Sequence, residues 1–254
     1  TMVLPGLLRT LVPAVIVFTA CSDASAPGPA PGKLEALPRD LSVAEQKMIA
    51  GNNAFGFDLL HVINADQHGK NVFVSPISAS MALGMTMNGA ADGATFDAMR
   101  RALRLDGASR QEIDEGYQSL IALLRGLDPS TGFRSSHSLW SEQTLPVESS
   151  FINESKTFFD ASVAPLDFSK EKSSVDAING WGNTATKEKI PRIIDGIDQG
   201  EVMFLINAIY FKGSWLDQFD KSKTADAEFH SLGGSTSTAM MYRTGPVLAG
   251  DDGR

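Results

Sequence analysis

The chain has 254 residues, of which 43% are hydrophobic and 20% charged, and its 22 Lys and Arg residues against 30 Asp and Glu residues give a formal net charge of −8. This length and apolar content suffice for a buried core, so the composition excludes a disordered chain, and a single cysteine excludes a disulfide-stabilised scaffold. The acidic balance argues against a general nucleic-acid-binding protein, which would carry a basic patch.

The first 40 residues are interpreted as a targeting segment and a tether. Residues 1–20 contain an apolar run that is too short to span a bilayer but suits a signal peptide. The only cysteine, Cys21, follows directly, and this arrangement resembles a bacterial lipoprotein signal, in which the cysteine becomes a lipidated membrane anchor. The alternative is cleavage by ordinary signal peptidase near residues 24–26, which would discard Cys21. Residues 21–40 are rich in Pro and Ala and predict an extended tether, so we expect a secreted or membrane-anchored protein outside the cytoplasm.

The folded region, residues 41–254, is expected to begin with a helix. Ser42 and Glu45 have the spacing of a capping box, and apolar residues follow at helical intervals as far as Ile63. Residues 71–74 then read as a short apolar strand.

The next element is predicted to be a helix buried in the interior. Ser75 and Pro76 supply an N-cap and a proline at the first helical position, and the helix should run to about Asn88. Its residues are small or apolar on nearly every face, which indicates burial, and its methionines favour core packing over a soft-metal site. Further helices are expected over residues 95–105 and 109–124, the second opened by another capping box.

Strands and helices alternate in the second half of the chain. Strands are expected at residues 137–140 and 163–168, with a helix over residues 148–160 between them. A further helix, capped by Ser173 or Ser174, should follow.

Residues 201–211 predict a long strand that is almost wholly apolar. Such a strand should be covered on both faces and lie at the centre of a large sheet. Asn207 in its middle is the exception, because a buried amide without hydrogen-bond partners costs about 1–3 kcal/mol. With no internal repeat visible, the sequence predicts a single α+β domain.

Motifs of catalysis, metal binding or nucleotide binding are not found. The histidines lack the spacing of a metal site, and a lone cysteine excludes a CxxC zinc site. No GxSxG, GxxxxGK[ST] or GxGxxG motif occurs, and the acidic residues are scattered. His61 and His137 are each interpreted as structural residues. The residues alone therefore predict a protein that is not an enzyme and that uses neither a metal nor a cofactor.

Several motifs, in order along the chain, resemble the serpin family of protease inhibitors. Residues 71–83, from Asn71 through Pro76, resemble the strand that leads into serpin helix B, and residues 89–95 match the turn that follows it. Residues 178–190 resemble the end of serpin helix F; the matching positions there are Asn179, Trp181, Thr186 and Lys189.

The resemblance continues through the apolar strand. Residues 205–229 are similar to the third strand of serpin sheet A and the segment after it; the matching positions include Asn207, Lys212, Gly213 and Trp215. Met240 and Met241 fit paired methionines further on. One departure is Glu188, which stands where the family usually has Gly, so the turn after helix F is expected to differ.

The resemblance implies an α+β serpin-like domain in which helices surround a large central sheet. It covers about the first two-thirds of that domain, so residues 41–254 would be C-terminally incomplete. It further implies an inhibitor of serine, or sometimes cysteine, proteases that acts as a suicide substrate. The protease cleaves a reactive loop, which then inserts into sheet A as a new strand. That loop lies near the C-terminus of serpins, so the resemblance places it outside this chain.

The implied partner is a target protease, and the full-length protein would be a monomer. The alternative is a non-inhibitory serpin fold that serves as a binding or carrier protein at the cell surface.

The resemblance also places Ser75, Ser78 and Asn207 in the serpin shutter, where helix B underlies the sheet that must open. A buried polar cluster can be satisfied in two arrangements, which would let the sheet part without unpaired groups. The alternative is that the two serines only cap the helix and that Asn207 bonds locally. Trp215 is expected to pack in the core near the top of the sheet.

Overall fold

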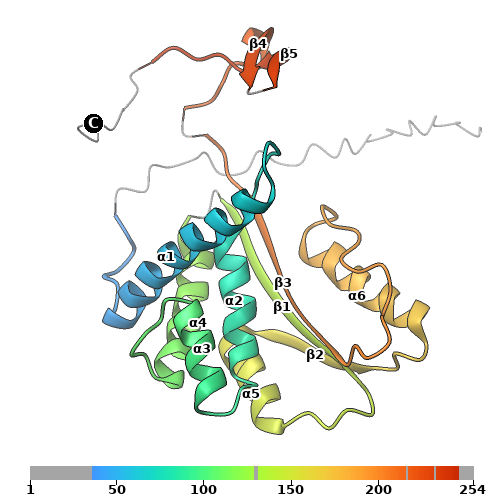
Figure 1. Ribbon diagram of the computed structural model, residues 1–254. Coiled ribbons are helices and arrows are strands. Elements are labelled where there is room, and N and C mark those ends of the chain that lie inside the picture. Colours follow the sequence, from blue (N-terminus) through green and yellow to red (C-terminus); the bar gives the residue numbers. More distant parts are fainter. Residues whose placement is uncertain (1–35, 129–130, 216, 232, 246–254) are drawn as a thin grey trace, which may run out of the picture.

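The computed structural model describes residues 36–128, 131–215, 217–231 and 233–245 (Figure 1). The predicted signal peptide, Cys21 and most of the predicted tether lie outside these residues. The described elements, in chain order, are α1 (Val43–Asp66), α2 (Pro76–Met87), α3 (Ala94–Ala102), α4 (Arg110–Gly126), β1 (Gly132–Glu142), α5 (Ser149–Phe159), β2 (Ala161–Leu166), α6 (Glu171–Ala185), β3 (Met203–Lys212), the short 3-10 helix η1 (Lys221–Lys223), β4 (Ala225–Ser231) and β5 (Gly234–Met240).

Both predicted capping boxes are present. The Ser42 side chain accepts from the backbone N–H of Glu45, and the Glu45 carboxylate accepts from the backbone N–H of Ser42 at 2.8 Å. Ser109 and Glu112 make the same reciprocal pair at the start of α4. Each pair satisfies N–H groups that a helix start leaves unpaired, which is why the two boundaries could be located from the sequence.

The predicted strand at residues 71–74 is not formed. This segment is assigned no secondary structure, and the Phe73 side chain is 98% exposed. A strand requires a hydrogen-bonded neighbour, and none of the strands in the described part of the chain pairs with residues 71–74. The apolar pattern of residues 71–74 therefore does not by itself produce a strand, because no neighbouring strand pairs with it among the described residues.

The predicted cap of α6 was also wrong. The helix begins at Glu171 with Lys170 as the N-cap residue, so Ser173 and Ser174 lie inside its first turn. The Ser173 hydroxyl donates to the carbonyl of Lys170 at 2.9 Å, and the Ser174 hydroxyl donates to the carbonyl of Asp167 at 2.9 Å. Both serines bind backbone carbonyls and leave the N–H groups of the helix start uncapped.

The main sheet has the strand order β2-β1-β3. β1 pairs with β2 in parallel and with β3 in antiparallel orientation. The parallel pair is joined through α5, as such a connection requires. The expectation that residues 201–211 form the centre of the sheet is therefore wrong for the described residues, where β1 is central and β3 lies at an edge.

Helices lie on both faces of this sheet. Figure 1 shows α2 to α5 on one face and α6 on the other, and β3 contacts both α2 and α6. Most residues of β3 are half-buried rather than fully buried. Coverage of both faces, which the apolar sequence of this strand predicted, is thus present in part.

The core is built around α2, as its composition predicted. Met81, Met85 and Met87 have no measurable exposure, and they belong to one cluster with Tyr117 of α4 and Phe159 of α5. Sulfur-containing side chains adapt to irregular gaps, which suits a helix that is surrounded by other elements.

The hairpin of β4 and β5 differs from the rest of the fold. Every residue of both strands is exposed, and Figure 1 shows the hairpin apart from the helices and the main sheet. Among the described helices, none combines the length and the apolar character that a bilayer-spanning segment needs.

Candidate functional site

The candidate site is a set of polar side chains where α2 crosses the main sheet. Ser78 lies in the first turn of α2, and its hydroxyl donates to the side-chain oxygen of Asn207 in β3. Both side chains are half-buried. The helix and the strand are therefore joined here by a hydrogen bond between side chains.

The set continues from β3 into β1. The register places His137 of β1 directly opposite Asn207, and the Asn207 amide nitrogen lies 3.1 Å from His137 Nδ1. The same amide nitrogen lies 3.4 Å from His137 Nε2, which in turn lies 3.0 Å from the hydroxyl of Ser135. We call Ser78, Asn207, His137 and Ser135 the crossing cluster.

The hydrogen bonds of Asn207 restrict the protonation of His137. The Asn207 oxygen is occupied by the Ser78 hydroxyl, so its amide group faces the ring and donates to Nδ1. In the tautomer that fits the shorter of its two ring contacts, Nε2 carries the proton and donates to Ser135. This arrangement requires a neutral imidazole.

The surroundings of His137 favour that neutral form. Its side chain is 1% exposed, and burial lowers its pKa to about 4, with a smaller contribution from the positive charge of Arg125 and an opposing one from Asp160. Arg125 donates to the Ser135 carbonyl at 2.7 Å and pairs with Asp160 at 3.1 Å. A charged imidazole would have to be stabilised in a site with little water, which is why its protonation is disfavoured.

The structure brings two of the three predicted shutter residues together. Ser78 and Asn207 are in contact, whereas the Ser75 side chain is exposed and makes no capping hydrogen bond. At the start of α2, Ser75 contributes its backbone carbonyl, which accepts from the N–H of Ala79 at 3.2 Å. The prediction that Ser75 caps α2 through its side chain is therefore wrong, although Ser75 does occupy the N-cap position.

Sequence reasoning missed His137 and Ser135. Both are polar residues at alternate positions of one strand, and both are buried at 2% exposure or less. Alternation places them on the same face of β1, where Asn207 also points. The signal was present, but their burial could be recognised only once β1 was known to be the central strand.

Two other residues from the matching motifs shape the segment after α6. Asn179 accepts through its side-chain oxygen from the backbone N–H groups of Ile193 and Ile194, at 2.7 and 3.0 Å. Thr186 is 1% exposed, and its hydroxyl oxygen accepts from the N–H of Ile190 at 3.0 Å. These contacts hold the chain against the end of the helix.

The remaining motif residues lie at the margins. Trp181 is half-buried in α6, Pro76 is the first residue of α2, and Asn71, Lys212 and Gly213 are exposed. Trp215 is 65% exposed and contacts the Phe219 ring edge-on at 5.5 Å between centroids. The expectation that Trp215 packs in the core is wrong, because none of the described elements covers the segment after β3.

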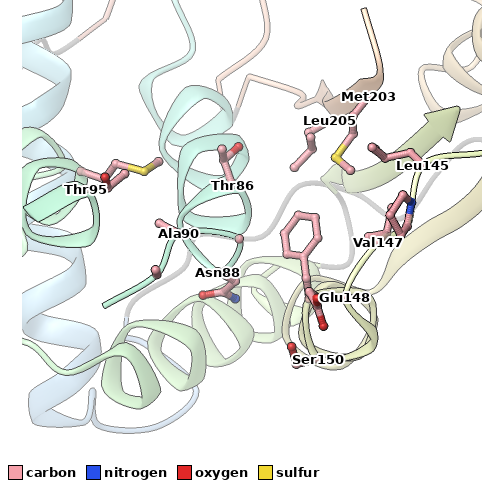
Figure 2. A pocket seen from close by; sticks show the side chains of 15 residues that line it. Thr86, Asn88, Ala90, Thr95, Leu145, Val147, Glu148, Ser150, Met203 and Leu205 are labelled. Carbon is pink, nitrogen blue, oxygen red and sulfur yellow. The ribbon is translucent and has the colours of Figure 1, made fainter. Parts of the chain in front are cut away.

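A cavity of about 660 Å³ lies between the C-terminal end of α2, the start of α5 and β3 (Figure 2). Leu205 and Met203 line it, and these residues share a face of β3 with Asn207 because side chains alternate along a strand. Its other walls come from the end of α2, the start of α5 and the loop before α5, and they include Ala90, Leu145, Val147 and Phe151. A volume of this size lies within the range of small-molecule sites.

The chemistry of these groups suits conformational change better than catalysis. Within the part of the chain that the structure describes, no group of three His, Cys, Asp or Glu residues could hold a metal ion. The crossing cluster offers hydroxyl, amide and imidazole groups that already bind each other. What the arrangement can do is hold α2, β3 and β1 together, and exchange one set of hydrogen bonds for another.

Comparison with known proteins gives one consistent result. A family model described as "Serpin (serine protease inhibitor)" matches residues 50–253. Serpin A12 of Homo sapiens is 28% identical over 211 residues, which cover 83% of this chain and 51% of that protein. The leukocyte elastase inhibitor of Sus scrofa is 32% identical over 202 residues, which cover 78% of this chain and 53% of that protein.

The solved structures agree. Reactive-loop-cleaved human thyroxine-binding globulin superposes with a TM-score of 0.74 at 29% identity, covering 79% of this chain and 60% of that chain. The chain spans about half the length of the curated relatives it matches.

Proposed function

Because the chain belongs to the serpin family, we propose that it provides the scaffold of a serine protease inhibitor that acts as a suicide substrate. In this mechanism the protease cleaves an exposed reactive loop, and the cleaved loop inserts into the sheet that contains β1 and β3. The protease remains attached as an acyl-enzyme with a distorted active site. The partner is a serine or cysteine protease, and the inhibitor acts once.

The observation that carries this proposal is the contact between α2 and β3. Insertion of a strand requires β3 to shift relative to the helix beneath it. Interlocked apolar side chains resist such a shift because a packed core has few arrangements. The crossing cluster replaces that packing with hydrogen bonds, and these can be remade with new partners after the shift.

The test is formation of a covalent complex. The product of the full coding sequence is mixed with trypsin, chymotrypsin or elastase, and the mixture is separated by denaturing electrophoresis. We expect a band at the summed mass of inhibitor and protease. The matched control is the same protease with its active-site serine blocked, which should give no such band. Cleavage of the protein without any stable complex would contradict the proposal.

A carrier function is the second candidate, and the cavity at the C-terminal end of α2 favours it. Thyroxine-binding globulin, to which this chain is similar, is named for a small molecule that it binds. A carrier should bind thyroxine in a one-to-one complex without forming any protease complex. Ala90→Phe, which would fill the cavity, should weaken that binding, whereas Ala227→Phe on the exposed strand β4 should not. Equal thyroxine binding by the two variants would show that the cavity is not the binding site and would contradict its use as evidence for a carrier.

We further propose that the protein is exported by a bacterium and anchored through a lipid on Cys21. The support is the apolar run that directly precedes this cysteine. Radiolabelled palmitate should become incorporated into the protein in cells, and Cys21→Ser should abolish the label and release the protein from the membrane fraction. A mature protein that begins after Cys21 would establish the alternative cleavage instead.

A further inference from the structure

His137 is the one buried histidine of the described residues, and it lies next to the contact between α2 and β3. His61, His68 and His230 are exposed, whereas His137 is 1% exposed. The Asn207 amide ends in an oxygen, which accepts, and an amino group, which donates. Which of the two faces Ser78 depends on whether the ring nitrogen of His137 near Asn207 is an acceptor or a donor. With Nδ1 as an acceptor, the Asn207 oxygen is left free for Ser78.

The groups around the ring come from each neighbouring element. β3 contributes Asn207, and β2 contributes Ala161, which pairs with His137 on the other side. The end of α5 contributes the Phe159 ring, whose centroid lies 5.9 Å from that of the imidazole. Among the described residues, the charged groups that act on the ring are Arg125 of α4 and Asp160 at the end of α5, and these two form an ion pair with each other.

We propose that His137 is a positioning residue that holds the Asn207 oxygen toward Ser78, and that movement of β3 away from this arrangement is coupled to the uptake of one proton by His137. This inference rests on the proposed function, because it assumes that β3 shifts over α2. A protonated ring carries an N–H group at each of its two nitrogens, which lie 3.1 and 3.4 Å from the Asn207 amide nitrogen. It can no longer accept from Asn207, so the amide must turn its oxygen toward the ring and away from Ser78.

The direction of the pH effect follows from the site. In the closed arrangement burial lowers the pKa of His137 to about 4, whereas in an open, hydrated arrangement it returns toward its ordinary value of 6.5. The open form therefore binds more protons between these two values, so opening becomes easier as the pH falls from 6.5 to 4. The opening constant should rise by up to tenfold for each pH unit inside this window, and by about 80-fold between pH 6.5 and pH 4. Above pH 6.5 this contribution disappears.

The experiment is native-state hydrogen exchange of the full chain, measured on peptides from β1 and β3 from about pH 7.5 to about pH 4.5 and corrected for the intrinsic rate. We expect the opening constant to rise about 40-fold between about pH 6.5 and about pH 4.5. His137→Gln keeps a polar, neutral side chain and should flatten this dependence. The matched control is His230→Asn, a change on the exposed strand β4 that should leave the wild-type dependence intact. An equally steep profile in His137→Gln would overturn the proposal.

A second measurement uses the wild-type chain and needs no variant. In an NMR titration the ring of His137 should stay neutral until about pH 4. A titration of His137 near 6.5 in the folded chain would also overturn the proposal. Both measurements concern this chain alone, so they can succeed where no protease complex is found, and they can fail while the protease complex forms.

Discussion

Replacement of Glu188 by glycine should stabilise the fold. Glu188 has φ +62°, in the left-handed region that costs a non-glycine residue about 1–2 kcal/mol. Glycine removes this cost but adds about 0.5–1 kcal/mol of chain entropy to the unfolded state. The backbone hydrogen bond from the N–H of Glu188 to the carbonyl of Asn183, at 2.7 Å, does not depend on the side chain. The net expectation for Glu188→Gly is a gain of about 0.5–1 kcal/mol, or a Tm increase of about 1–4 °C.

Thermal and urea denaturation, followed by circular dichroism, measure this gain. Lys189 serves as the matched control, because it is exposed and is not among the residues with positive φ. Lys189→Gly should therefore lower stability. Lys187 also has φ +50°, but its ammonium group lies 4.9 Å from the centre of the Tyr210 ring, so Lys187→Gly should gain less than Glu188→Gly. A Glu188→Gly variant no more stable than the wild type would refute the argument that strain resides in this turn.

Further predictions concern buried polar groups. Asn207→Ala should lower the free energy of unfolding by about 2–4 kcal/mol in urea titrations, because it leaves the hydrogen-bond partners on α2 and β1 unpaired; an unchanged midpoint would contradict the role of the cluster. Glu45 is fully buried, and the Arg39 guanidinium holds the pKa of its carboxyl well below the usual range. The charged carboxylate therefore stabilises the fold at a pH above the ordinary pKa of glutamate, and this stabilisation is lost as the pH falls. Glu45→Gln should therefore cost about 2 kcal/mol at neutral pH and less in acid, and a constant difference across pH would argue against the charged pair. Burial raises the pKa of Asp114 to about 6, so folding is weakened as the pH rises through 6. Asp114→Asn should thus melt at a higher temperature than the wild type at pH 8 but not at pH 4, and equal shifts at both would exclude titration as the cause.

Much of the secondary structure could be predicted from short stretches of sequence. The starts of α1, α2 and α4 follow from Ser42, Pro76 and Ser109, because caps and prolines act on N–H groups within one turn. The burial of α2 was likewise visible in its composition. Where the local signal was ambiguous, as at the two serines near the start of α6, the predicted boundary was wrong by a few residues.

The candidate site could be predicted only in part. Asn207 was recognisable because a single amide interrupts an apolar strand, and Ser78 came from the resemblance to a family motif. The contact between them joins residues 129 positions apart in the chain, and no local pattern reports such a contact. His137 looked like an ordinary strand residue until its neighbours were known.

The sequence by itself determined the starts of α1, α2 and α4, the apolar character of β3 and the position of its one amide, since these depend on residues within a turn or two of each other. Only the tertiary structure decided that β1 is the central strand, that His137 is buried against Asn207, and that Phe73 and Trp215 are exposed. Strand order and burial depend on which distant segments pair, and that choice is made by packing over the whole molecule. For the same reason, the residues of a segment do not show whether another strand pairs with it. This is why the expected strand at residues 71–74 and the expected central position of β3 were both wrong.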